Sequence, residues 1–114
     1  MLLRKLFTLS FICIVCASCA LFHEDMKIVN EALAKKDFSS AIIELDDMKS
    51  SYAKKLNSKV HVDFALSILK DLTQEANLRY LTAKDLLEKA VSLDPKNKDA
   101  RVYYLMVLKL IKND

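Results

Sequence analysis

Hydrophobic residues recur at intervals of three and four along most of this 114-residue chain, which is the spacing of one face of an α-helix. Polar residues interrupt this spacing after residue 24 and divide the rest of the chain into five segments. The expected helices cover residues 24–36, 37–57, 58–77, 82–94 and 98–112. Because the connections have only a few residues, neighbouring helices should lie antiparallel. The pattern therefore predicts an all-α chain of antiparallel helix pairs, with one domain over residues 24–114.

Single polar residues mark where the middle helices begin and end. Asp37 is a favoured N-cap for the second helix, Ser58 for the third and Thr82 for the fourth. Proline disfavours helix in the residue before it, so Asp94–Pro95 ends the fourth helix. These residues set the predicted boundaries.

The same spacing predicts which side chains form the core. They are the apolar residues on the inward face of each helix. The predicted core contains Ile28, Val29, Ala32, Leu33, Phe38, Ala41, Ile42, Leu45, Met48, Tyr52, Val62, Ala65, Leu66, Leu69, Leu72, Ala76, Ala83, Leu86, Leu87, Ala90 and Val91.

The last predicted helix is apolar almost all round. Nine of the ten residues 102–111 are hydrophobic, and Lys109 carries the only charge among them. Such a helix must be buried on every side or exposed to a partner. Tyr104, Leu105, Leu108 and Ile111 should face the preceding helix pair. The partner-binding residues are then expected to be Val102, Tyr103, Met106 and Leu110, which would meet another protein or a second copy of the chain. The alternative is that the long third helix folds over them.

The first eighteen residues have the layout of a secretory signal peptide. Arg4 and Lys5 form a basic start, residues 6–16 are mostly apolar, and small residues follow. Ala17-Ser18-Cys19 resembles the bacterial lipobox, although Cys16 stands where leucine is usual. We therefore expect a lipoprotein signal peptide at 1–18, lipidation of Cys19 with palmitate-type acyl chains, and a short tether at 19–23. The alternative is an uncleaved membrane anchor over the 17 residues 6–22.

Removal of the signal peptide would lower the net charge of the chain and leave it without a free thiol. The formal net charge of +3 falls to +1 without Arg4 and Lys5. Cys13 and Cys16 leave with the signal peptide, and a lipidated Cys19 offers no thiol. Disulfide, zinc-thiolate and cysteine-nucleophile chemistry are therefore not expected in the mature domain.

The rest of the sequence offers little chemistry. The chain has no glycine, which argues against phosphate-binding loops, dinucleotide-binding fingerprints and glycine-flanked nucleophiles. His61 and Asp63 should form a solvated helix start, because residues two apart on a helix point to different faces. The acidic cluster Glu44, Asp46 and Asp47 is interpreted as a solvated surface. The basic cluster Lys54, Lys55 and Lys59 favours lipid headgroups or an acidic partner rather than nucleic acid. We expect no catalytic residue, no cofactor, no metal and no nucleic-acid partner.

A weak internal repeat has a familiar form. Phe38, Ala41 and Leu45 recur 42 residues later as Tyr80, Ala83 and Leu87. Together with Ala90 and Pro95, the second unit resembles the tetratricopeptide repeat family. The repeat offset of that family is 34, so the resemblance implies a longer third helix in a fragment of an α-solenoid. A plain helical bundle is the alternative.

The resemblance and the signal peptide together imply a protein-interaction scaffold rather than an enzyme. Among lipoproteins with such repeats, the chain looks like a short version of the lipoprotein component of the outer-membrane β-barrel assembly machinery. Ala20 follows Cys19 without an aspartate, which favours the periplasmic face of the outer membrane. The alternatives are a surface-displayed lipoprotein that binds external molecules, and a lipid-anchored accessory factor or enzyme of the cell wall.

Overall fold

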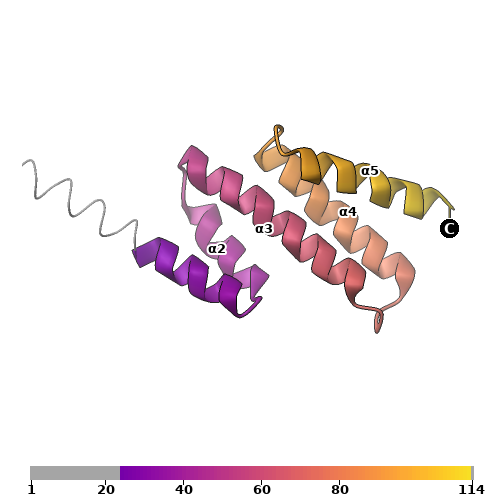
Figure 1. Cartoon of the computed structure of the whole chain (residues 1–114), viewed down its shortest axis with the longest axis horizontal. Coiled ribbons are helices and arrows are strands. Elements are labelled where there is room, and N and C mark those ends of the chain that lie inside the picture. Colours follow the sequence, from indigo (N-terminus) through magenta and orange to yellow (C-terminus); the bar gives the residue numbers. More distant parts are fainter. Residues whose placement is uncertain (1–23, 114) are drawn as a thin grey trace, which may run out of the picture.

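The computed structural model describes residues 24–113, which form helices and no strand (Figure 1). A first helical segment covers residues 24–34. It is followed by α2 (Phe38–Asp47), α3 (Ser51–Lys70), α4 (Ala76–Leu93) and α5 (Lys98–Asn113). The prediction of an all-α chain of five helices is confirmed for this part of the chain. The predicted signal peptide at 1–18 and the tether at 19–23, with Cys19, lie outside the described residues.

Each helix packs mainly on the helices that adjoin it in sequence. α3 lies between α2 and α4, and α4 lies between α3 and α5, with a smaller contact between α3 and α5. In Figure 1 the helices follow one another across the molecule in chain order, with segment 24–34 at one end and α5 at the other. This sequential packing of antiparallel pairs is that of a short helical-repeat array.

The boundary between α2 and α3 differs from the prediction. α2 ends at Asp47, and the Ser50 side chain accepts a hydrogen bond of 3.1 Å from the Ala53 N–H at the start of α3. The predicted extension of the second helix to residue 57 is therefore wrong. The predicted cap Ser58 lies inside α3 and is fully buried.

The boundary between α3 and α4 also comes earlier than predicted. α3 ends at Lys70, and the Asp71 side chain then accepts hydrogen bonds from the backbone and hydroxyl of Thr73. α4 begins at Ala76, so the predicted cap Thr82 lies in its interior. The predicted cap at Asp37 is confirmed, because its side chain accepts a hydrogen bond from Ser40 at the start of α2. The predicted helix end at Asp94–Pro95 is also confirmed, because α4 ends at Leu93.

The buried side chains form two cores, one on each side of α3. The N-terminal core consists of Val29, Ala32, Ala41, Leu45, Ala53 and Val60. The C-terminal core consists of Val62, Ala65, Ala83, Leu87, Ala90, Ala100 and Val107. Three predicted core residues are instead exposed, namely Ile28 by 43%, Tyr52 by 59% and Leu72 by 81%. Tyr52 belongs to α3, and Leu72 lies in the turn after it, so the misplaced boundaries explain both.

The second helix pair repeats the first in its buried positions. The corresponding pairs are Val29 and Ala32 with Val62 and Ala65, Ala41 and Leu45 with Ala83 and Leu87, and Ala53 and Val60 with Ala100 and Val107. The caps correspond as well, because the Asn97 side chain accepts from the Ala100 N–H at 3.2 Å as Ser50 accepts from Ala53. α3 has 20 residues and is the longest described helix, as the resemblance implied for the third helix. α4 is also long, with 18 residues where α2 has 10.

Candidate protein-interaction surface

α5 is packed on one side and exposed on the other. Ala100 and Val107 are fully buried, and Tyr104 and Ile111 pack partly against the C-terminal core. Leu105 was expected to face inward, but 60% of it is exposed. The prediction is wrong because Ala100 and Val107 fix the inward face, and Leu105 lies about 160° round the helix from Val107 at 100° per residue.

Three of the four predicted partner-binding residues lie on the exposed side. Val102 is exposed by 62%, Met106 by 41% and Leu110 by 37%, and their spacing of four aligns them in one stripe along α5. Tyr103 is half-buried and packs partly against the C-terminal core. α3 contacts α5, but within the described chain it leaves this stripe exposed.

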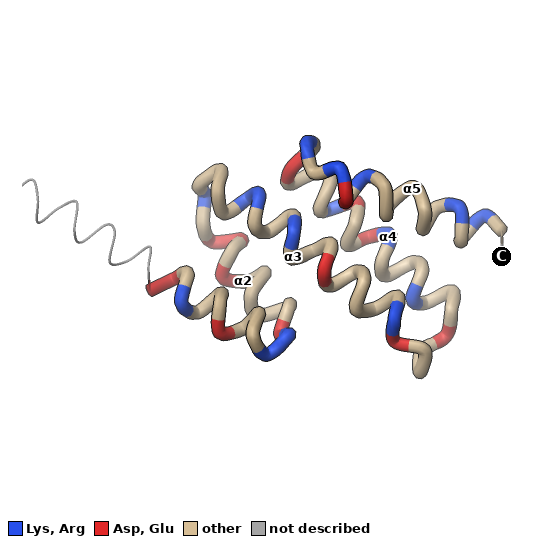
Figure 2. The backbone as a smooth tube through the Cα atoms, in the orientation of Figure 1, with Lys and Arg blue, Asp and Glu red and all other residues tan. Residues whose placement is uncertain are grey.

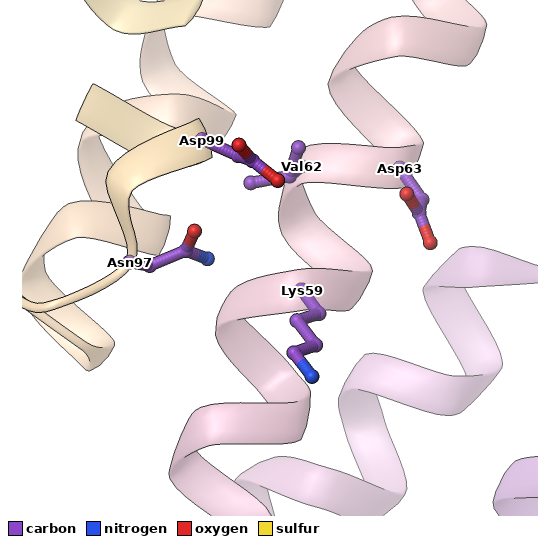
Figure 3. Close-up of a pocket in the computed structure, with 5 residues that line it drawn as sticks. All are labelled: Lys59, Val62, Asp63, Asn97 and Asp99. Carbon is purple, nitrogen blue, oxygen red and sulfur yellow. The ribbon is translucent and has the colours of Figure 1, made fainter. Parts of the chain in front are cut away.

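The correspondence between α3 and α5 shows which way the stripe faces. Ala100 and Val107 of α5 correspond to Ala53 and Val60 of α3. In the same alignment of the two helices, the positions of the stripe correspond to those of Lys55, Lys59 and Asp63 in α3. Lys59 and Asp63 help to line a hollow of about 210 Å³ between α3 and the start of α5 (Figure 3). The stripe therefore continues the face of the molecule on which this hollow opens.

Both helices contribute to the hollow. In Figure 3, Asn97 and Asp99 reach from the start of α5 towards Val62 of α3. Asp99 precedes Met106 by seven residues, which places the two on one face of α5. The apolar stripe thus has a carboxylate at its beginning.

A second hollow of about 370 Å³ lies on the other side of α3. It is lined by Lys36, Phe38, Asp63, Leu66, Ser67 and Lys70. Asp63 lines both hollows, so they adjoin along α3. We call the two hollows and the stripe Val102, Met106 and Leu110 the groove surface.

The polar clusters singled out from the sequence do not form a reactive site. The Asp46 carboxylate accepts a hydrogen bond of 2.7 Å from the Asn57 amide, which joins α2 to α3. His61 is only 4% exposed, so the prediction of a solvated helix start is wrong there. Burial lowers the pKa of His61, although the nearby Asn57 carbonyl, 2.8 Å from Nδ1, opposes this shift. Asp63 is exposed on a different face.

Two kinds of feature are absent from the described residues. Residues 24–113 hold no group of three or more histidine, cysteine, aspartate or glutamate side chains placed to bind a metal ion. Among the same residues, no helix combines the length and apolarity needed to cross a bilayer.

The sequence prediction missed the contribution of α3 to the groove surface. The misplaced boundary at Ser58 put Lys55 in the second helix and Lys59 in the third, although α3 carries both. The alanine and valine seven residues apart in α3 and again in α5 would have revealed the common face. Compared with known proteins, the chain matches no family model, and no curated protein or solved structure matches it significantly.

Proposed function

We propose that the chain is a membrane-anchored bacterial lipoprotein whose tetratricopeptide-like helices bind a protein partner at the groove surface. The observation that carries this proposal is the exposed stripe Val102, Met106 and Leu110, which continues the face formed by two hollows. Single exposed apolar residues are common on soluble proteins, but a contiguous apolar patch marks a binding site more often.

The chemistry of the groove surface suits an amphipathic segment. The stripe would bury apolar side chains of a partner, and each fully buried aliphatic side chain contributes about 1.5–3 kcal/mol. Lys59, Asp63 and Asp99 offer charged groups of both signs beside it. The partner segment should therefore carry aliphatic residues flanked by charged ones, and the function is binding rather than catalysis, with no cofactor.

The cellular location is proposed from the N-terminal sequence. The signal layout of residues 1–18 and the small residues before Cys19 support lipidation at that cysteine. The absence of aspartate after Cys19 favours the periplasmic face of the outer membrane, where a β-barrel assembly complex is the proposed partner.

Lipidation is tested by growing a bacterial host that expresses the full chain with an alkyne-tagged palmitate. We expect label on the parent and on Cys16→Ser, and loss of label in Cys19→Ser. Label that survives in Cys19→Ser, or no label on the parent, would contradict lipidation of Cys19 and favour the uncleaved anchor.

Partner binding is tested with a photo-crosslinking amino acid at Met106, and at exposed Ser39 of α2 as the matched control. Membranes are solubilised in mild detergent, and crosslinked proteins are identified by mass spectrometry. We expect a defined adduct at position 106 only, and its loss when Leu110→Glu is added. Recovery of a β-barrel protein would support the assembly role. A folded Met106→Glu/Leu110→Glu variant that still recovers every partner of the parent would refute binding at this surface.

A further inference from the structure

The two ends of the helical array can be identified from the two sides of α3. One side packs on α2, where Asn57 donates to Asp46 and the Phe64 ring stacks on Phe38 with ring centroids 5.4 Å apart. Val60 belongs to the same side, because it lies in the N-terminal core. This side of α3 faces the N-terminal end of the array.

The other side of α3 packs on α4. The Ser58 hydroxyl donates a hydrogen bond of 2.7 Å to the Ala90 carbonyl, and Val62 and Ala65 belong to the C-terminal core. This side faces the C-terminal end. The corresponding sides of segment 24–34 and α5 therefore form the outer ends of the described array.

The C-terminal end is basic. Matching Ala53 and Val60 to Ala100 and Val107 places Leu105, Lys109 and Lys112 of α5 where Ser58, Val62 and Ala65 stand in α3. Leu105 is 60% exposed, and both lysines are exposed together with Arg101, one helical turn before Leu105. A further repeat helix packed here would cover two lysines at positions that are apolar and buried in α3. We call Arg101, Leu105, Lys109 and Lys112 the basic end.

The N-terminal end is acidic. Matching Val29 and Ala32 to Val62 and Ala65 places Glu24, Lys27 and Glu31 where Asn57, Val60 and Phe64 stand in α3. Ile28 lies beside them and is 43% exposed. We call Glu24, Lys27, Ile28 and Glu31 the acidic end. The neighbouring α2 carries Glu44, Asp46 and Asp47 and no lysine or arginine, although Asp46 is directed towards Asn57 of α3. Lys35 and Lys36 follow segment 24–34 and are exposed.

The charge is therefore polarised along the array. Residues 24–47 at one end hold seven carboxylates and three lysines, Lys27, Lys35 and Lys36 (Figure 2). At the other end α5 carries Lys98, Arg101, Lys109 and Lys112 against the single carboxylate Asp99. Each end combines its charges with one exposed aliphatic residue, Leu105 or Ile28. The two ends are complementary in charge and in apolar character.

We propose that copies of this chain stack end to end, with the basic end of one copy on the acidic end of the next. The contact buries Leu105 against Ile28 and brings the cations on either side of Leu105, Arg101 and Lys109, near Glu24 and Glu31. A two-fold contact between two α5 helices would instead bring lysines against lysines, which costs energy. The stacking contact joins unlike surfaces, so it leaves a free end on each copy and can extend into a row.

The association should be weak and sensitive to salt. Exposed charge pairs contribute little each, and their attraction is screened beyond about 10 Å at 0.1 M salt. The contact uses different residues from the groove surface. The stacking proposal can therefore be tested separately from the proposed function.

The test measures the mass of the purified full chain in a mild detergent by sedimentation, with micelles in large excess over protein. We expect the mass to rise with protein concentration at 0.05 M salt and to return to that of a single copy at 0.5 M. Constant mass at all concentrations, or association that persists unchanged at high salt, would overturn the proposal.

Two variants test the direction of the stack. Lys109→Glu/Lys112→Glu inactivates the basic end, and Glu24→Lys/Glu31→Lys inactivates the acidic end. All four residues are exposed, and circular dichroism checks that both variants fold. Each variant alone should self-associate at least roughly tenfold more weakly, because like charges now meet.

Mixing these two variants tests whether the basic end of one copy binds the acidic end of another. Lys109→Glu/Lys112→Glu keeps its acidic end, and Glu24→Lys/Glu31→Lys keeps its basic end, so these two unaltered ends can still meet. The altered end of the first variant is negative and that of the second is positive, so these can meet as well. Equimolar mixing should therefore restore association, whereas Met106→Glu/Leu110→Glu should associate like the parent. A mixture that stays single-copy, or one end variant that still associates as well as the parent, would overturn the end-to-end arrangement.

Discussion

A small group of buried polar residues ties the array together. Ser58 donates to the Ala90 carbonyl of α4 and accepts a hydrogen bond of 2.9 Å from Asn97 in the turn before α5. Asn57 reaches the other way to Asp46 of α2. Buried polar groups cost free energy unless they are hydrogen-bonded. These bonds therefore fix the position of α3 against both of its neighbours, which apolar contact alone would leave less specific.

His61, beside this group, should make stability depend on pH. Burial lowers its pKa in the folded chain from the ordinary value of 6.5, with Lys89 acting in the same direction and the Asn57 carbonyl and Asp46 opposing. The unfolded chain then binds a proton that the folded chain does not. The free energy of unfolding should therefore fall as pH drops below about 6.5, and level off below the folded pKa.

Urea denaturation at steps between pH 7 and pH 5 measures this effect. His61→Asn, which does not titrate, should have a flatter profile than the parent. Asp37 and Asp71 do not interfere, because hydrogen bonds from Ser40 and Thr73 lower their pKa values below the usual 3.8. Equal slopes in parent and variant would contradict the role of His61.

Lys36 adopts a left-handed backbone conformation that glycine would adopt with less strain, in a chain that has no glycine. It has φ of 57°, in the left-handed region, and its N–H donates to the Leu33 carbonyl while the Asp37 N–H donates to Ala32. These two bonds close segment 24–34 in the way that usually requires glycine. Lys36→Gly should raise the free energy of unfolding by about 0.5–1 kcal/mol, as measured by urea denaturation. Lys36→Ala keeps the steric penalty, so an equal gain in that variant would contradict the explanation.

At the scale of helices, the sequence predicts those ends that carry a strong local signal. Asp94–Pro95 ends α4 where expected, and Asp37 caps α2. The α2–α3 break has no proline or glycine, and the apolar spacing continues through it to Tyr52. Ser50 and Ser58 are equally good caps by residue type. Only packing distinguishes them, because Ser58 is needed as a buried donor to α4.

The corresponding caps of α3 and α5 should differ in their effect on stability. Ser50→Ala removes one part-buried capping bond and should cost about 1 kcal/mol. Asn97→Ala removes a cap and also the bond to buried Ser58, so it should cost about 2 kcal/mol. Urea denaturation of both variants measures the difference. A larger loss for Ser50→Ala would contradict the role of Asn97 in joining α5 to α3.

At the scale of the whole molecule, α3 is the element shared by both cores and by both hollows. Of the apolar residues predicted for its core face, Val62 and Ala65 are buried and Leu66 and Leu69 pack partly against the C-terminal core. The all-α fold could be predicted from spacing alone. The groove surface could not, because it depends on how Lys59 and Asp63 of α3 lie relative to Asp99 of α5. That relation arises only from tertiary packing.

Two cores joined by one helix should make stability uneven along the chain. Leu45 anchors the N-terminal core and Leu87 the C-terminal core, and both are fully buried. Either residue changed to alanine should cost about 2–5 kcal/mol of local stability. In a repeat array each unit depends on its neighbours, so a loss in the N-terminal core should spread only partly to the C-terminal core.

Hydrogen exchange of backbone amides measures this difference. Leu45→Ala should speed exchange in residues 24–34 and in α2, while α4 and α5 keep most of their protection, because the C-terminal core does not contain Leu45. Leu87→Ala should speed exchange in α3, α4 and α5 together, and the short α2 and segment 24–34 should follow because α3 supports them. If Leu45→Ala accelerates exchange in α5 as much as in α2, the chain unfolds as one cooperative unit and the two cores are not separable.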